Sequence, residues 1–288
     1  MYVCGRGTDG YGTVLPALYQ TQKDYHLIDH VSVCATSRKS LDGLLLKKNE
    51  LDKKFDMDLS LDYWPREGKN SESYLEAISN LKDGYDCGII VVPDHQHYEI
   101  AEAVLKAGIH LLIVKPFVTE VNHAIDLIEL AEKNNLYGSV EFHKRYDYAN
   151  IKLRDELRND LIGDPLYFHV EYSQRKSIPE IFFSQWSEKT NVFQYLGVHY
   201  VDLIHFLTGA LPTRVIAIGQ KKWLIKNEID TYDSMEVVIE WVLKENNFIS
   251  THLTNWIDPN TTSAMSDQKI KVVGTKGRIE SDQKNRGI

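Results

Sequence analysis

Short apolar runs alternate with helix-like segments through the first half of the chain. The runs Gly88–Val92 and His110–Val114 flank residues 97–107, whose apolar side chains recur at helical spacing. Two apolar runs joined by about three helical turns predict a βαβ crossover in a parallel sheet. Such a sheet binds ligands outside the carboxyl ends of its strands, and Lys115 falls at one of these ends.

The same alternation extends over the first 142 residues. In chain order we expect a strand at 2–4, a helix at 11–21, a strand at 31–35, a helix at 41–55, a loop at 62–72, helices at 73–81 and 118–134, and a strand at 137–141. This order is typical of an α/β fold with a doubly wound parallel sheet.

After residue 142 the pattern changes, and strands come to dominate. We expect helices at 147–159 and 193–207 and strands at 165–172, 214–219, 234–241, 248–256 and 269–273. Long consecutive strands joined by turns predict an antiparallel sheet. The expected division is therefore a nucleotide-binding domain at 1–142 and an α+β domain at 143–288.

Composition narrows the class of protein. The 288 residues include 43% hydrophobic and 26% charged side chains, with a net charge of −8, as in ordinary globular proteins. The negative charge argues against nucleic acid or a membrane surface as a partner. No apolar run approaches the ~18 residues of a membrane span, and the N-terminus does not resemble a signal peptide. We expect a cytoplasmic location, and the abrupt ends suggest a longer natural protein, truncated at the C-terminus.

The three cysteines give no sign of a special site. Cys4, Cys34 and Cys87 form no CxxC pair, which argues against a metal site or a redox dithiol. Each lies in or beside a predicted strand, so we interpret them as small buried core residues. Histidines and carboxylates also show no metal-ligand spacing, and no bound metal is expected.

A glycine-rich motif near the N-terminus predicts a cofactor-binding loop. Gly5, Gly7 and Gly10 form a GxGxxG that also contains Thr8 and Asp9. In a strand–loop–helix context these glycines permit a tight turn, close approach to a pyrophosphate and close packing of the helix. The alternative is a merely flexible glycine-rich turn.

The end of the second strand bears on the choice of cofactor. An NAD site usually places an acidic residue here, but no acid occurs between Val31 and Leu41. Thr36, Ser37 and Arg38 instead supply hydroxyls and a cation that suit a 2′-phosphate. We therefore favour NADP over NAD, with an ordinary surface role for Arg38 as the alternative.

Several short motifs resemble those of one enzyme family. They are Leu15-Pro16-Ala17-Leu18, Pro93-Asp94-His95-Gln96-His97, Lys115-Pro116, Leu161-Ile162-Gly163, Gly197-x-His199-x-x-Asp202 and Gly274-Thr275-Lys276-Gly277. Their order and spacing resemble the glucose–fructose oxidoreductase, inositol dehydrogenase and rhizopine-catabolism (Gfo/Idh/MocA) family of NAD(P)-dependent sugar dehydrogenases. The resemblance implies an N-terminal Rossmann domain, a C-terminal domain with a large open sheet, and a substrate bound between them.

The resemblance also implies catalytic roles for Lys115 and His199. The lysine would contact the reacting hydroxyl, and the histidine would act as a base or orient the sugar. This agrees with elementary chemistry, because an imidazole can accept the hydroxyl proton and an ammonium group stabilises a developing alkoxide. The alternatives are a packing histidine and a surface lysine. Asp202 shares a helix face with His199 and is more structural than catalytic in our interpretation, although substrate contact stays open.

Two positions depart from the family pattern. Val114 replaces the glutamate before the signature lysine, and Tyr195 stands where the family often has an aspartate, four residues before His199. A tyrosine phenol could bind the substrate or donate a proton, so Tyr195 is a candidate catalytic and substrate-binding residue. The alternative is that its ring fills space.

Five further residues are candidates for ligand contact. Lys144 and Arg145 follow a predicted strand and could bind an acidic or hydroxylated substrate group, with ion pairing as the alternative. His97 lies at the turn that begins with Pro93, near the expected nicotinamide ribose, with capping or packing as the alternative. Pro93 and Pro116, with Lys115, are expected beside the cofactor.

Together these observations predict an oxidoreductase that moves a hydride between NAD(P) and a secondary hydroxyl or keto group of a sugar, cyclitol or sugar derivative. A non-catalytic NAD(P)-binding sensor or regulatory protein on the same fold is the alternative. A homodimer or homotetramer is expected, because an open sheet needs its outer face covered. The sequence leaves the sugar and the physiological direction open.

Overall fold

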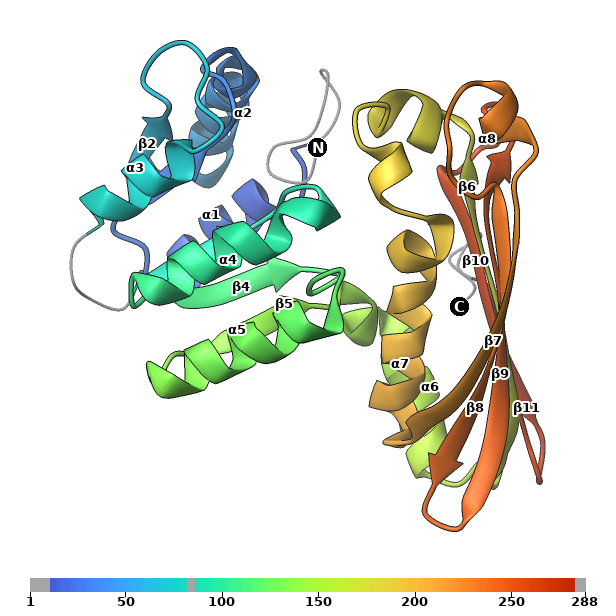
Figure 1. Cartoon of the computed structure of the whole chain (residues 1–288). Coiled ribbons are helices and arrows are strands. Elements are labelled where there is room, and N and C mark those ends of the chain that lie inside the picture. Colours follow the sequence, from blue (N-terminus) through green and yellow to red (C-terminus); the bar gives the residue numbers. More distant parts are fainter. Residues whose placement is uncertain (1–10, 82–85, 283–288) are drawn as a thin grey trace. The chain divides into compact units, whose positions relative to one another are not determined.

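The computed structural model describes residues 11–81 and 86–282, and these divide into two compact units (Figure 1). The glycine-rich motif and the strand predicted before it lie outside the described residues. Within the described part of the chain, no helix is long and apolar enough to cross a membrane.

The first unit consists of short strands that alternate with helices. Its strands are β1 (Val31–Cys34), β2 (Leu61–Trp64), β3 (Cys87–Ile90), β4 (His110–Val114) and β5 (Gly138–Glu141). Its helices are α1 (Val14–Tyr25), α2 (Lys39–Phe55), α3 (Ser73–Asn80), α4 (His97–Lys106) and α5 (Val121–Lys133). β1 pairs with β2 and β3 pairs with β4, both in parallel, and β5 follows β4 in the sheet. The predicted α/β class with a parallel sheet is confirmed.

The crossover from β3 through α4 to β4 illustrates how the sequence specifies this unit. Ala101, Val104 and Leu105 recur at helical spacing and are buried. A Cβ built on Gly88 of β3 would lie only 2.8 Å from a methyl carbon of Val104, so glycine permits the close approach of helix and strand. Gly108 ends the connection with a φ of +76°, which glycine adopts without strain.

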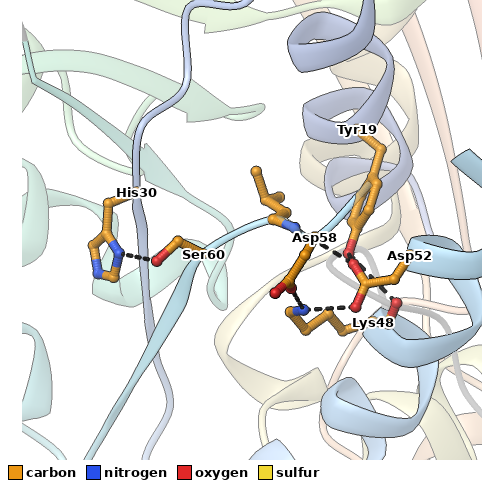
Figure 2. Close-up of polar contacts among 7 residues, drawn as sticks. Tyr19, His30, Lys48, Asp52, Asp58 and Ser60 are labelled. Atoms are coloured by element: carbon orange, nitrogen blue, oxygen red, sulfur yellow. Dashed lines mark hydrogen bonds and ion pairs between the residues drawn. The ribbon is translucent and has the colours of Figure 1, made fainter. Parts of the chain in front are cut away.

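A partly buried polar cluster joins α1, α2 and the segment before β2 (Figure 2). The hydroxyl of Tyr19, which is fully buried, donates to the carboxylate of Asp52. The Lys48 ammonium group donates to Asp52 at 2.6 Å and to Asp58 at 2.5 Å. Because its members bond to one another, the cluster fixes the helices without leaving a buried polar group unpaired.

Two expectations for this unit were wrong. The segment 62–72 was expected to be a loop, but its first residues belong to β2. Every residue of β2 is half-buried instead of alternately buried and exposed, so its pairing with β1 leaves no periodic signal in the sequence. Cys34 and Cys87 were expected to be buried, but both are exposed. Cys34 is the last residue of β1 and Cys87 is the first residue of β3, so neither lies in the interior of its strand.

The second unit is built on a six-stranded sheet in the order β11-β10-β6-β9-β8-β7. Its strands are β6 (Pro165–Arg175), β7 (Leu211–Gln220), β8 (Ser234–Leu243), β9 (Asn246–Asp258), β10 (Ser266–Gly274) and β11 (Arg278–Asp282). Only the β6–β9 pairing is parallel among the pairings of these strands. The predicted mostly antiparallel sheet is confirmed.

The core of this unit lies on one face of the sheet. Phe168, Val170 and Tyr172 alternate along β6 and are buried. They belong to one hydrophobic cluster with Tyr200 and Leu203 of α7 (Val198–Thr208), the helix that runs along the sheet (Figure 1). The shorter α6 (Tyr148–Arg158) contacts α7.

The edge strand β7 is exposed along its whole length. All ten of its residues are exposed, including Val215, Ile216 and Ile218. Alternate residues of a strand point to opposite faces, so apolar side chains of β7 are uncovered on both faces.

Candidate functional site

Two short segments that follow β3 and β4 belong to the second unit. Residues Pro93–His95 and Val114–Glu120 group with residues 140–282, not with the strands that precede them. Asp94 and Lys115 therefore lie in the same unit as Tyr195 and His199. This is the edge of a parallel sheet at which ligands bind.

Lys115 is held by one residue. Its side chain is only 7% exposed. Its ammonium group donates a 2.7 Å hydrogen bond to the main-chain carbonyl of Tyr195 and lies 3.6 Å from the centre of the Tyr195 ring. Burial lowers the pKa of Lys115 to about 8, although the carboxylates of Asp94 and Glu141 act in the opposite direction. At neutral pH the buried Lys115 is therefore mostly charged, and its pKa lies only about one unit above the pH.

The Tyr195 ring belongs to an aromatic cluster. Its centre lies 4.7 Å from the ring of Phe183, 6.2 Å from Trp186 and 6.0 Å from Trp256. Aromatic rings prefer such tilted and edge-to-face contacts, and a cation over a ring face is attracted by the ring quadrupole. These contacts support the alternative that the Tyr195 ring fills space. The same residue also holds Lys115 through its carbonyl and its ring.

A π-helical turn, η5 (Phe193–Gly197), carries Tyr195. The predicted helix 193–207 is therefore present, but its first turn is wider than an α-helical turn. A Cβ built on Gly197 would lie 2.3 Å from the Phe193 ring, so this turn requires glycine at position 197. Such single π turns are frequent at functional sites.

His199 is the second residue of α7, the α-helix that follows the π turn. It is 3% exposed, and its ring centre lies 4.7 Å from that of His143. Its Nδ1 atom is buried and makes no hydrogen bond within the part of the chain that the structure describes. Burial lowers the pKa of His199 well below its ordinary value, and the positive charges of Lys115, His143 and Lys144 lower it further. The imidazole is therefore neutral and has an unused polar atom.

Two of the predicted substrate-binding residues bind each other. Arg145 donates through Nε to Asp202 at 2.8 Å and also through Nη2, and this pairing raises the pKa of Arg145. Lys144 donates to Asp147 at 3.2 Å. These bonds fix η2 (His143–Tyr146) to α7 and to Asp147, the N-cap residue of α6. They support a structural role for Asp202 and ion pairing for Arg145 and Lys144.

The predicted 2′-phosphate residues lie between β1 and α2. Thr36 is exposed, and the Ser37 hydroxyl lies 2.9 Å from that of Ser40. The guanidinium of Arg38 lies 5.3 Å from the centre of the Tyr63 ring, and its Nη1 atom is buried without a hydrogen-bond partner within the described residues. A buried unpaired donor is costly, so Arg38 has capacity for an anionic ligand. The loop residues Gly5, Gly7, Thr8, Asp9 and Gly10 are outside the described part.

The remaining predicted cofactor contacts are less distinctive. His97 is fully buried, and its Nε2 lies 3.1 Å from the carbonyl oxygen of Val92, which supports the packing alternative. Pro93 comes three residues after the end of β3 and Pro116 two residues after the end of β4, and the Lys115–Pro116 peptide bond is cis.

Sequence reasoning did not single out Asp94 as a site residue. Its carboxylate is 4% exposed and accepts hydrogen bonds from the Thr190 hydroxyl at 2.9 Å and the Gln194 amide at 3.0 Å. An acid immediately after a strand-ending proline was the available signal. Among the described residues, no group of three or more histidines, cysteines or carboxylates is arranged to hold a metal ion.

Two family models together match most of the chain. Residues 3–142 match the model described as the oxidoreductase family with an NAD-binding Rossmann fold, and residues 151–280 match the GFO/IDH/MocA C-terminal domain.

Individual relatives match smaller parts. A UDP-N-acetylglucosamine 3-dehydrogenase of Acidithiobacillus ferrooxidans is 34% identical over 143 residues, which are 50% of this chain and 42% of that protein. An inositol 2-dehydrogenase of Salmonella typhimurium is 26% identical over 51% of this chain and 42% of that protein. The chain thus spans less than half the length of these relatives.

Solved structures match over a larger part of the chain. The myo-inositol 2-dehydrogenase of Lactobacillus plantarum has a TM-score of 0.72 at 18% identity, over 93% of this chain and 74% of that one. The scyllo-inositol dehydrogenase of Lactobacillus casei, solved with bound NAD(H) and scyllo-inositol, has a TM-score of 0.70 at 15% identity, over 94% and 74%. At these identities the likeness concerns the fold.

Proposed function

Because the chain belongs to the GFO/IDH/MocA oxidoreductase family, with its NAD-binding Rossmann fold, we propose that it is an NAD(P)-dependent dehydrogenase or reductase. The substrate is a sugar, cyclitol or sugar derivative, and the reaction interconverts a secondary hydroxyl and a keto group. The relatives named above as acting on inositol and on a nucleotide sugar support this class of substrate.

One observation carries the proposal. Lys115 and His199 lie in one compact unit as a buried ammonium group and a buried neutral imidazole, and the pKa of each is lowered by burial. Burying these groups costs stability, and strongly shifted pKa values cluster at functional sites. A hydroxyl between them would find both a proton acceptor and a positive charge.

The roles of the two residues follow from their charges. The neutral His199 imidazole, whose Nδ1 has no hydrogen-bond partner among residues 11–81 and 86–282, accepts the proton of the substrate hydroxyl. The Lys115 ammonium group stabilises the alkoxide that develops on the same oxygen. A bound nicotinamide supplies the hydride chemistry, and the residues near Arg38 would hold its adenosine end.

We favour NADP over NAD on the strength of Arg38. Its buried Nη1 has no hydrogen-bond partner within the described residues, and a guanidinium binds a phosphate bidentately. Thr36 and Ser37 add hydroxyl donors beside it. NAD remains the alternative, and both cofactors belong in the first assay.

The test is a turnover assay on the purified chain. The protein is mixed with NADP or NAD and a panel of polyols, inositols and nucleotide sugars, and absorbance at 340 nm is followed. We expect turnover with at least one substrate and at least a hundredfold loss in Lys115→Ala, since removal of one transition-state charge costs about 10²–10³ in rate. Lys106→Ala, an exposed lysine on α4, is the matched control.

A non-catalytic sensor is the second candidate. Tyr195 stands where the family often has an aspartate, and its main-chain carbonyl accepts the hydrogen bond that Lys115 could otherwise donate to a substrate. A sensor would bind the cofactor with micromolar affinity by calorimetry and give no turnover with any substrate of the panel. Lys115→Ala would then leave cofactor binding unchanged.

We also propose that the protein is a homodimer or homotetramer. The exposed apolar residues of β7 support this, since large exposed apolar faces mark interaction sites. Light scattering on the purified protein tests it, and a monomer at micromolar concentration would contradict it. Ile216→Glu should weaken the assembly, whereas Gln220→Glu on the same strand should not.

A further inference from the structure

Asp94 is a buried carboxylate with a fixed orientation. The Thr190 hydroxyl and the Gln194 amide both donate to the same oxygen of Asp94, Oδ2. Thr190 is itself fixed, because its main-chain carbonyl accepts a 2.8 Å hydrogen bond from the Thr231 hydroxyl. Thr190 precedes the π turn that carries Tyr195, and Gln194 lies within that turn. The same segment therefore positions the carboxylate and the carbonyl that Lys115 uses.

Several charged and titratable groups surround Lys115. Its hydrogen bond goes to the Tyr195 carbonyl and not to a carboxylate. Asp94 and Lys115 follow neighbouring strand ends, because β3 and β4 pair in parallel with Ile90 opposite Ile113. From there Asp94 favours the charged form of Lys115 through space, more strongly than Glu141 does. Glu141 is 35% exposed and pairs with His143 at 3.0 Å, so solvent and its own partner weaken its field. His199, itself beside His143 and Lys144, is neutral and opposes neither carboxylate.

We propose that Asp94 is a positioning residue whose buried carboxylate keeps the Lys115 ammonium group charged at neutral pH. Burial alone would drive Lys115 toward its neutral form, and the carbonyl and ring of Tyr195 carry no net charge. Asp94 supplies the missing negative charge from a position that the side chains of Thr190 and Gln194 fix. Its effect on rate rests on the proposed function, whereas its effect on the charge of Lys115 does not.

The direct experiment measures the charge of Lys115 without turnover. The whole protein is acylated with a trace of an amine-selective reagent between pH 6 and 10, and labelling of Lys115 is quantified by mass spectrometry. In Asp94→Asn we expect the pH of half-maximal labelling to fall by about one unit, because a nearby opposite charge shifts a lysine by about that amount. Asparagine retains an oxygen for both hydrogen bonds, so the fold should persist.

Three variants separate charge from structure. Asp94→Glu retains the negative charge, so the pH of half-maximal labelling should return to within about 0.3 of the wild-type value. Thr190→Val removes a hydrogen bond but no charge and should move the midpoint less than Asp94→Asn. Glu141→Gln removes the weaker charge and should also move it less. An unchanged midpoint in Asp94→Asn, or a larger shift in Glu141→Gln, overturns the proposal.

Kinetics then distinguish this proposal from the proposed function. If the wild type turns over, the alkaline limb of kcat/KM should move to lower pH in Asp94→Asn, by the same amount as the labelling midpoint. A chain without turnover would refute the dehydrogenase, yet the labelling midpoints would still support or overturn the role of Asp94.

Discussion

The Lys115 ammonium group donates to the Tyr195 carbonyl at 2.7 Å and lies 3.6 Å from the centre of the same residue's ring. A carbonyl dipole and an aromatic face replace part of the water that the ammonium group loses on burial. The replacement is incomplete, because the pKa of Lys115 is still lowered from 10.5 to about 8. The chain therefore maintains a destabilising cation at the end of β4, which is expected of a functional group and not of a packing residue.

Replacing Lys115 should stabilise the protein while it abolishes activity. The lowered pKa means that the folded state binds the lysine proton less tightly than the unfolded state. The cost is fully present below pH 8 and disappears as the pH rises toward 10.5. At pH 7 it amounts to roughly 3 kcal/mol at about 1.4 kcal/mol per pH unit. Lys115→Met should raise Tm at pH 7, and the gain should shrink by pH 10. A lower Tm at pH 7 would contradict this.

The same titration predicts the pH dependence of the reaction. If charged Lys115 stabilises the alkoxide, kcat/KM should fall as the pH rises through about 8, where the lysine loses its proton. Lys115→Arg provides the control, since a guanidinium stays charged to pH 12 or so. Its residual activity should lack this alkaline limb. An identical limb in both proteins would assign the titration to another group.

The hydroxyl of Tyr195 should be dispensable. Tyr195→Phe retains the carbonyl and the ring that hold Lys115, so we expect kcat to stay within about threefold of the wild type. A phenol that donated the reacting proton would instead contribute on the order of 10²–10⁴ in rate. Tyr195→Ala is the contrasting variant, because loss of the ring from its aromatic cluster should cost about 3–5 kcal/mol of stability. The measurements are steady-state kinetics and thermal melts.

Most of the fold could be predicted because its signals are local. His110–Val114 was predicted at its exact observed bounds, and Ser234 was predicted as the first residue of β8. These segments have strong apolar periodicity and clear breakers. β2 was not predicted, because each of its four residues is half-buried and only the partner strand β1 defines it.

The sequence identified the main residues of the site, but it did not predict the contacts among them. Lys115 and His199 could be selected from chemistry and motif position. That Tyr195 presents its carbonyl to Lys115 depends on a π turn, and a helical pattern does not distinguish a π turn from an α turn. The pairing of Arg145 with Asp202 joins residues 57 apart in sequence, and no periodicity reports such a contact.

Gly197 should be essential to the π turn. Its missing Cβ leaves room for the Phe193 ring, which would otherwise lie 2.3 Å away. Gly197→Ala should cost about 1–3 kcal/mol through overpacking and lower kcat/KM by displacing Tyr195. The matched control is Gly43→Ala on the exposed face of α2, where nothing lies within 4 Å of the added methyl. That change should stabilise the protein by about 0.5–1 kcal/mol. Partial rescue by Phe193→Leu would tie the defect to this contact.

Arg38 should determine cofactor preference. A charge-assisted hydrogen bond to the 2′-phosphate contributes about 1.5–3 kcal/mol, so Arg38→Ala should weaken NADP binding by about 10- to 100-fold and NAD binding little. Lys39→Ala is the matched control, because Lys39 is the adjacent exposed cation at the start of α2. Calorimetric titration of both cofactors measures the ratio. Equal losses for NADP and NAD would mean that Arg38 supports the fold of the loop through Tyr63, and the preference for NADP would have to be abandoned.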